Sequence, residues 1–408
     1  MSELVPTLRF PKYKDNLKQA SIENLTKLVT SGSRDWAQYY ASSGSLFIRM
    51  TNLCRETSTI DLSNLKFVDV PHKSKDGFRT KLEYGDVLIS ITAELGKIGL
   101  VPINLKNAYI NQHIALIKPY DAKDGRFLAH YLTAPKSHKR LNRLNDSGAK
   151  SGLNLSTIKR FIIQTPNQQE QQKIADFLTS VDSKISQLTE KHRLLSQYKK
   201  GVMQQIFSQQ LRFKDDDGSE FGAWEEFSLS QLGSFLGGGT PSTENDFFWR
   251  GDIPWISSSD IQEDKLFTIN ISRYINTSAI RNSATKVIPA NSLLIVSRVG
   301  IGKFAVCNQE ICTSQDFTNF TPNTSNVNFM AYLLSHNKNR LLSLGQGTTI
   351  KGFTVSDLSS LKLEIPCLAE QQKIAQFLQA IDAKIDATRQ QIEQTKLFKK
   401  GLLQQMFV

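Results

Sequence analysis

The residues that could form a catalytic centre are few, and their spacing fits no common catalytic pattern. Asp86, Glu94 and Lys97 come nearest to a nuclease triad of carboxylates and a lysine, but the Glu-x-x-Lys spacing of the last two is wrong for one. The six histidines are dispersed along the chain, so they give no support to metal catalysis. We therefore expect neither nuclease chemistry nor a catalytic metal from this sequence.

Nucleotide and methyl-transfer chemistry also lack their motifs. A nucleotide-driven motor needs Gly-x4-Gly-Lys-Ser/Thr to cradle phosphates. Gly96-Lys97 and Gly302-Lys303 are followed by isoleucine and phenylalanine, and Gly237-Gly238-Gly239 has no lysine after it, so we expect a turn there. Amino-group methyltransferases carry a motif such as Asn/Asp-Pro-Pro-aromatic, and the sequence has no Pro-Pro pair. The sequence thus predicts a protein that is not an enzyme by itself.

The charge of the chain points to a polyanionic partner. The 408 residues carry a formal net charge of +12, and the pI is about 9.4. Such an excess suits nucleic acid or an acidic membrane surface, although a basic chain can also be merely soluble. No apolar run approaches the roughly 18 residues of a membrane helix, and the first residues have no signal-peptide core. The cysteines form no CxxC pair, which fits a reducing cytoplasm; they are Cys54, Cys307, Cys312 and Cys367.

The strongest feature of the sequence is an internal repeat. Glu-Gln-Gln-Lys-Ile-Ala occurs at 170–175 and again at 370–375, and Lys-Lys-Gly occurs at 199–201 and at 399–401. The preceding segments match more weakly, with offsets of 203 to 206 in place of 200. A period this long indicates domain duplication and not a solenoid. We predict four segments: one domain twice, at 1–166 and 209–366, and a helix after each copy, at 167–208 and 367–408.

Both predicted helices carry a coiled-coil seam. Apolar residues recur every seven positions with a second series interleaved, which is the heptad pattern. The seam residues are Ile174, Leu178, Val181, Ile185, Leu188, Leu195, Ile374, Leu378, Ile381, Ile385, Ile392 and Leu402. A helix over about 168–208 would be about 60 Å long at 1.5 Å per residue, and it cannot bury such a seam alone. Two copies of one seam favour mutual antiparallel pairing; packing of each helix on its own domain is the alternative.

The two globular segments have the mixed pattern of an α+β fold. Short β-branched runs at 88–92 and 293–297 follow turn-like pairs and predict strands. Further strands are expected at 46–49 and 253–256, and short helices at 127–132 and 330–334. The aromatic run Phe247-Phe248-Trp249 could stack on nucleic acid, but packing in the core is the preferred interpretation.

At the domain–helix junctions the chain resembles the specificity subunits of type I restriction-modification enzymes. The junction of recognition domain and conserved helix in that family is similar to the strand at 361–366 with the helix motif at 370–375. The copy at 162–175 is similar to the same junction. The end of the family's helix resembles residues 399–407. In the second domain, the family's opening strand resembles residues 251–256 and its late loop resembles residues 348–352. In the first domain, Ile48-Arg49-Met50-Thr51-Asn52 and Gly148-Ala149-Lys150-Ser151-Gly152 depart from that strand and that loop.

The resemblance implies a non-catalytic subunit that recognises DNA. Two homologous α/β target-recognition domains would each bind one half of an asymmetric bipartite target. The helices, paired as an antiparallel coiled coil, would fix the spacer and hold two methyltransferase subunits and, in the full complex, two restriction subunits. S-adenosylmethionine, ATP and Mg would belong to those partners, and no cofactor to this chain. The alternatives are the recognition module of a different methyltransferase or nuclease system, and a structural coiled-coil protein.

Base reading needs Arg or Lys for guanine and Asn or Gln for adenine, while phosphate contacts only position the protein. We select polar residues in loop-like places at or near repeat-equivalent positions. The candidates are Arg49, Asn52, Arg79, Lys97, Gln112, His113 and Lys150 in the first domain, and Ser258, Asp260, Arg298, Lys303, Gln315, Thr348 and Lys351 in the second. A solvated surface group is the alternative for each, and it is preferred for Asp260 because phosphate repels an acid.

Overall fold

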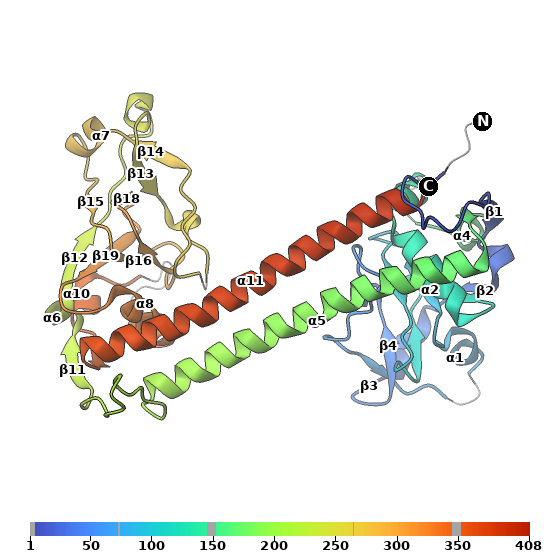
Figure 1. Ribbon diagram of the computed structural model, residues 1–408, viewed down its shortest axis with the longest axis horizontal. Helices are drawn as coiled ribbons and strands as arrows, with labels where there is room; N and C mark the ends of the chain where they lie inside the picture. Colours follow the sequence, from blue (N-terminus) through green and yellow to red (C-terminus); the bar gives the residue numbers. More distant parts are fainter. Residues whose placement is uncertain (1–4, 72–73, 145–151, 264, 345–351) are drawn as a thin grey trace. The chain divides into compact units, whose positions relative to one another are not determined.

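The computed structural model describes residues 5–71, 74–144, 152–263, 265–344 and 352–408 (Figure 1). The chain divides into two compact units. The first unit consists of Met1–His192 and Ala387–Val408, and the second of Arg193–Asp386. Each unit therefore holds one globular domain together with parts of both long helices. No helix of the described residues is long and apolar enough to span a membrane.

The first domain contains ten strands and four short helices among its described residues. The strands are β1 (Lys18–Ser21), β2 (Thr26–Ser31), β3 (Tyr40–Ala41), β4 (Ser45–Ile48), β5 (Phe67–Val68), β6 (Val87–Ser90), β7 (Ile98–Leu100), β8 (Ala108–Ile110), β9 (Ile114–Pro119) and β10 (Ile162–Thr165). The helices are α1 (Lys75–Thr80), α2 (Ala122–Thr133), α3 (Pro135–Arg143) and α4 (Leu155–Lys159), with 3-10 turns η1 (Glu23–Leu25), η2 (Asp35–Tyr39) and η3 (Met50–Asn52).

Two four-stranded sheets form this domain, in the orders β2-β9-β6-β7 and β3-β5-β4-β8. The pair β4–β8 is parallel, and the other pairs of the two sheets are antiparallel. All four residues of β6 are buried, as expected for an apolar strand that is covered on both faces. The strands β1 and β10 form a separate antiparallel pair beside the long helix.

The second domain repeats this architecture. Its strands are β11 (Glu225–Ser228), β12 (Gly233–Gly237), β13 (Ile253–Ile256), β14 (Arg273–Ile275), β15 (Val287–Ile288), β16 (Ser292–Val296), β17 (Phe304–Cys307), β18 (Ile311–Thr313), β19 (Phe317–Pro322) and β20 (Lys362–Ile365). Its helices are α6 (Leu229–Leu232), α7 (Thr277–Arg281), α8 (Val327–His336), α9 (Lys338–Leu344) and α10 (Val355–Ser359), with 3-10 turns η4 (Asp246–Trp249) and η5 (Ser258–Asp260).

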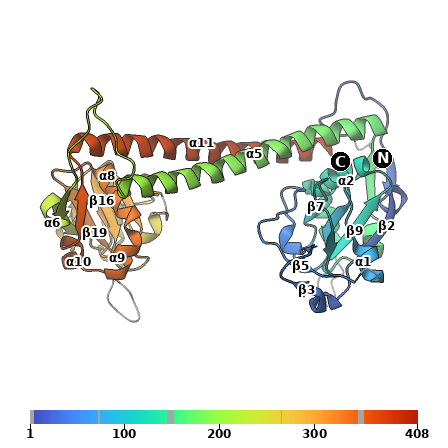
Figure 2. The same cartoon turned by 90° about the horizontal axis from the view of Figure 1, so that it is seen from below.

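The sheet topology shows the duplication independently of the sequence motifs. The order β12-β19-β16-β17 matches β2-β9-β6-β7, and the parallel pair β13–β18 matches β4–β8. The helix α8 lies against β16 (Figure 2), in the place that α2 takes against β6. The strands and short helices expected from the sequence are thus confirmed, and so is the α+β class. Of the aromatic run, Phe248 and Trp249 pack in a core cluster as expected, whereas Phe247 is 61% exposed.

The long helices α5 (Gln168–Phe207) and α11 (Leu368–Met406) pair in an antiparallel direction. In the first unit the beginning of α5 and the end of α11 share one core cluster, which contains Leu178 and Leu402. In the second unit the end of α5 and the beginning of α11 share another, which contains Ile206 and Leu378. Most seam residues are buried, and Leu195 and Ile385 are half-buried. The predicted helix pairing is therefore confirmed.

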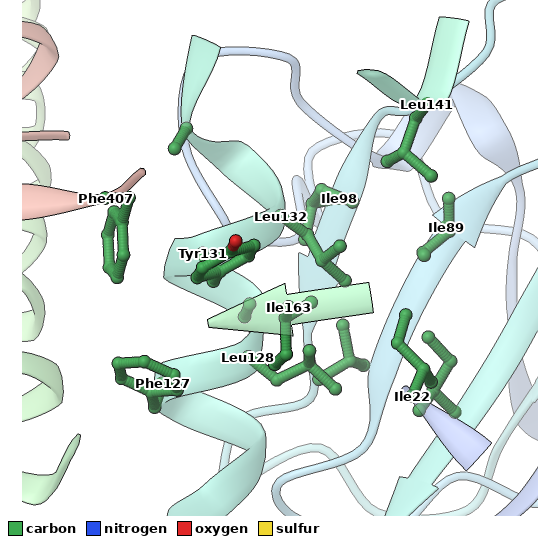
Figure 3. Packing of buried hydrophobic residues seen from close by; sticks show 14 of the residues in the cluster. Ile22, Ile89, Ile98, Phe127, Leu128, Tyr131, Leu132, Leu141, Ile163 and Phe407 are labelled. Carbon is green, nitrogen blue, oxygen red and sulfur yellow. The ribbon is translucent and has the colours of Figure 1, made fainter. Parts of the chain in front are cut away.

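The same clusters also join the helices to the domains. Phe407, the residue after α11, faces Phe127 and Tyr131 of α2 (Figure 3), with ring centroids 5.7 Å and 5.3 Å away. The hydroxyl of Tyr131 donates to the carbonyl oxygen of Val408 at 3.0 Å. The two interpretations left open by the sequence, mutual pairing and packing on a domain, are both realised, because each helix buries its apolar side against both neighbours.

Candidate nucleic-acid interface

A cavity of about 510 Å³ opens on the second domain where three strands of one sheet end. The residues that line it come from the end of β12, from just after β16, from the loop before β19 and the start of that strand, and from the segment before α10. Its lining includes Gly237, Ser297, Arg298, Gln315, Thr318 and Phe353. Two of the predicted base-reading residues, Arg298 and Gln315, are thereby brought to one site.

The local fold explains why Arg298 projects outward. The five residues of β16 are buried. Ser297 continues the strand, because its backbone N–H donates to the Asp316 carbonyl at 2.8 Å and its Oγ lies 2.9 Å from Thr318 Oγ1. The backbone N–H of Phe353 donates a hydrogen bond to the Ser297 carbonyl at 3.1 Å. Arg298 is the first exposed residue after the strand, and within the described residues no hydrogen bond or ion pair engages its guanidinium. It is therefore available to a ligand.

Two residues of the triple glycine, Gly237 and Gly238, line the other side of the cavity. Gly237 ends β12, and Gly238 passes so close to the loop before β19 that an added Cβ would lie 2.1 Å from the Ser314 carbonyl oxygen. Nothing lies within 4 Å of the place where a Gly237 Cβ would stand. The expectation of a turn at these glycines is wrong, because Gly237 is the last residue of a strand. At Gly238 only glycine permits the close backbone approach, and neither glycine fills the cavity with a side chain.

The first domain has an equivalent site, identified by the same backbone hydrogen bonds. The Leu153 N–H donates to the Ile91 carbonyl at 2.9 Å, and the Phe353 N–H donates to the Ser297 carbonyl in the same way. Likewise the Gly96 N–H donates to the Ser90 carbonyl, as the Gly302 N–H donates to that of Val296. Thr92 therefore occupies the position of Arg298. In the same way, Gln112 and His113 occupy the positions of Gln315 and Asp316.

The polar groups at this first site form a chain. Thr92 Oγ1 and His113 Nδ1 lie 2.6 Å apart, and His113 Nε2 and Gln112 Nε2 lie 3.0 Å apart. A glutamine thus stands at the same place in both domains, while its neighbours differ: threonine and histidine in one, arginine and aspartate in the other. In the second domain Gln315 accepts a hydrogen bond from the Thr240 hydroxyl.

The other candidates of the first domain are engaged inside the domain. Asn52 is 3% exposed, and its amide donates to the Asp61 carbonyl at 2.8 Å. Arg49 donates to the Asn64 carbonyl at 2.9 Å. Arg79 binds Thr30, the Ser31 carbonyl and Ser33 at the end of β2, and Lys97 pairs with Glu94 at 2.6 Å.

In the second domain Asp260 has a structural position. It is buried, caps the backbone of Ser257 at 2.8 Å and forms an ion pair with Arg273. Lys303 Nζ donates to the Ser258 carbonyl at 3.2 Å, which places both residues beside that same turn. The candidates Lys150, Thr348 and Lys351 lie outside the described residues.

The residues that most resembled a nuclease triad do not act together. Asp86 is 3% exposed and accepts hydrogen bonds from the Glu83 N–H at 2.8 Å and from Lys118 Nζ at 3.1 Å. Burial raises the pKa of Asp86 to about 6, and Lys118 only partly opposes this. Glu94 instead pairs with Lys97 at the surface. Among the described residues no group of three or more His, Cys, Asp or Glu side chains could hold a metal ion.

Sequence reasoning missed Thr92 and Asp316. The signal was present, because the hairpin glycines Gly96 and Gly302 differ by 206 and this offset equates Thr92 with Arg298. The offset then falls to 203 at Gln112 and Gln315, so the two alignments have to be applied separately. Thr92 and Asp316 join the candidate interface on this basis.

Comparison with known proteins gives the family. The family model described as type I restriction modification DNA specificity domain matches twice, at residues 61–195 and 222–397. A putative type I restriction enzyme MjaX specificity subunit of Methanocaldococcus jannaschii is 27% identical over 361 residues, covering 85% of this chain and 83% of that protein. The EcoR124I/EcoR124II specificity subunit of Escherichia coli is 30% identical over 163 residues, covering 38% and 40%.

Solved structures show the same fold. The S subunit of a type I restriction-modification system from M. genitalium has a TM-score of 0.63 at 14% identity, and the match covers 99% of both chains. A chain from a study of assembly and conformational transition in the type I system has a TM-score of 0.53 at 17% identity, and the match covers 97% of both chains.

Proposed function

We infer a function for this chain from its family: it belongs to the type I restriction-modification DNA specificity subunits. It is the DNA-recognition subunit of such a system, and the catalytic activities reside on partner subunits. Within that frame we propose that the domains at 1–166 and 209–366 each read one half of an asymmetric bipartite target. We propose further that the helices at 167–208 and 367–408 set the spacer and hold two methyltransferase and two restriction subunits, which bind S-adenosylmethionine, ATP and Mg.

The observation that carries this proposal is the pair of equivalent sites with different side chains. Gln112 and Gln315 occupy the same place in the two domains, and a glutamine side chain can make a bidentate contact with adenine. Arg298 can make a bidentate contact with guanine, whereas Thr92, at the equivalent position, cannot. One scaffold with two different polar surfaces is what an asymmetric two-part target requires.

The test is Arg298→Ala in the complex with the methyltransferase partner, measured as binding to duplexes that carry every base at each target position. If Arg298 makes a bidentate base contact, the variant should lose about 1–3 kcal/mol of discrimination at one position of one half-site. Arg281→Ala, an exposed arginine at the end of α7, is the matched control and should leave the discrimination unchanged.

Two other outcomes are informative. If Arg298 contacts phosphate, affinity should fall for all sequences, and the salt slope should decrease by about 1. If neither discrimination nor salt dependence changes, Arg298 does not belong to the interface, and the second site has to be sought elsewhere on the domain.

A further inference from the structure

Two ion pairs cross from one long helix to the other in the middle of apolar seams. In the first unit Lys399 Nζ lies 2.5 Å from Asp182 Oδ1, and these residues are 2% and 8% exposed. In the second unit Lys199 Nζ lies 2.6 Å from Asp382 Oδ1. A lysine as buried as Lys399 is rare, because removing its charge from water is costly unless a partner is present.

The two pairs specify one and the same helix register. In antiparallel helices, facing residues have numbers with a constant total, and 182 with 399 and 382 with 199 both total 581. Each helix contributes to these pairs an aspartate and, 17 positions later, a lysine, so the duplication reproduces the pair. The register found in the first unit is therefore the register found in the second.

Each pair also includes a side chain of the adjoining domain. Tyr332 of α8 donates its hydroxyl to Asp382 Oδ2 at 2.6 Å, and Lys199 lies 5.0 Å from the centre of that ring. In the first unit the equivalent residue of α2 is His130, whose Nδ1 lies 3.8 Å from Asp182 Oδ2. The ion pairs therefore lie where both helices and a recognition domain meet.

The apolar seam by itself cannot choose this register. Its residues recur every seven positions, so a slip of one heptad would again bring apolar residues face to face. The same slip would separate both ion pairs. Asp182 would face Ile392 or Met406, and Lys399 would face Ala175 or Thr189. Each charge would be left without its partner, and breaking a buried pair is strongly destabilising even where the pair adds little net stability.

We propose that the pairs Asp182–Lys399 and Asp382–Lys199 are positioning residues that select the helix register and thereby the spacer between the two half-sites. This inference rests on the proposed function. A slip of one heptad would displace the two recognition domains by about 10.5 Å along the helices. At about 3.4 Å per base pair, that displacement corresponds to about three base pairs of spacer.

Other contacts favour the same register, so the test has to remove the ions and leave those contacts in place. Two such contacts hold the end of α11: Phe407 packs against Phe127, and the Leu8 N–H donates to the Gln405 carbonyl at 3.0 Å. We therefore expect a graded effect on spacer choice and not a complete change of register.

The experiment compares the methyltransferase complex of the wild-type chain with one carrying leucine at all four positions, Asp182→Leu, Lys399→Leu, Asp382→Leu and Lys199→Leu. Binding is measured to duplexes with the native spacer and with spacers three base pairs shorter and longer. The wild-type ratio between native and altered spacers should fall by about tenfold or more in the variant. Glu393→Ala with Lys396→Ala removes an exposed pair within α11 and should keep the wild-type ratio.

An unchanged spacer ratio in the folded leucine variant would overturn the inference. If that variant does not fold, charge reversal decides: Asp182→Lys alone should lower the ratio, and addition of Lys399→Asp should recover it, while failure to recover counts against the inference. A merely structural role would lower affinity equally for all spacers. A wild-type complex that binds no split site would instead refute the proposed function.

Discussion

The buried histidine His130 should make the folded chain sensitive to acid. The residue lies on α2, is 1% exposed and has Nε2 3.2 Å from Thr179 Oγ1. Burial lowers the pKa of His130 to about 3, and the nearby charges of Lys399 and Arg126 act in the same direction. Asp182 Oδ2, at 3.8 Å, would favour a protonated ring, but Lys399 already neutralises that carboxylate at 2.5 Å. The folded chain therefore keeps His130 neutral.

The size and sign of the effect follow from linkage. The unfolded chain binds a proton at His130 with a pKa near 6.5, whereas the folded chain does not, so stability is fully present above about pH 6.5 and is lost as the pH falls. At about pH 5 the unfolded state gains about 2 kcal/mol from this proton. This result depends little on the folded pKa, provided that it lies well below 5.

The assay is urea unfolding of the full chain at about pH 7.5 and pH 5, followed by circular dichroism. His130→Gln removes the titration and keeps a donor for Thr179, so between these two pH values it should lose about 2 kcal/mol less unfolding free energy than the wild type. Equal losses in the wild type and in His130→Gln would refute the assignment of a neutral buried histidine.

Three further predictions concern other parts of the chain. Burial raises the pKa of Asp86 to about 6, so its contribution to stability falls as the pH rises through about 4 to 6, and Asp86→Asn should remove that fall in the same unfolding assay. Replacing segment 209–366 by that of a relative should change one half-site in methylome sequencing; a change in both would contradict modular reading. The fragment 1–208 should dimerise in light scattering, with Asp182 facing Lys199 of the second copy; a monomer at micromolar concentration would count against this.

The fold was largely predictable because its strongest determinants are local or repeated. The long helices are recognisable from their seven-residue apolar period, and Pro166 and Pro366 mark where each one starts. In the structure α5 begins at Gln168 and α11 at Leu368. The buried runs of β6 and β16 are recognisable as strands from their β-branched composition. The order of strands was not predictable, since β4 pairs with β8 across some 60 residues and no short-range signal marks the partner.

The site was less predictable, because long-range partners decide whether a polar side chain is available. Asn52 and Asp260 were chosen as loop residues with base-reading side chains. The fold instead uses them at equivalent places to cap a short turn, where the Asp61 carbonyl and Arg273, in neighbouring loop and strand segments, provide the partners. Arg298 and Gln315 stay at a cavity because β16 ends at Val296, two residues before Arg298, and because Gly237 and Gly238 on the opposite side carry no side chains that would fill it. Composition alone does not separate these two outcomes.

The two copies also show which contacts the architecture needs and which it leaves free to vary. Arg9 binds Glu170 through two hydrogen bonds of 2.7 Å, and Arg212 binds Glu370 through two of 2.8 Å, so each domain is tied to the start of its helix in the same way. Both glutamates are 1% exposed or less. Loss of either arginine would leave a buried carboxylate unpaired, a strongly destabilising change.

No such penalty applies at the equivalent positions Thr92 and Arg298, where the two copies keep the same backbone hydrogen bonds with different side chains. A side chain there can change without disturbing the sheet, since the strand hydrogen bonds are made by the residue before it. The fold therefore separates the residues that hold the two domains on the helices from the residues of the candidate interface. Under the proposed function, substitutions at Thr92, His113, Arg298 and Asp316 would change the target sequence and leave the ion pairs between the long helices unchanged.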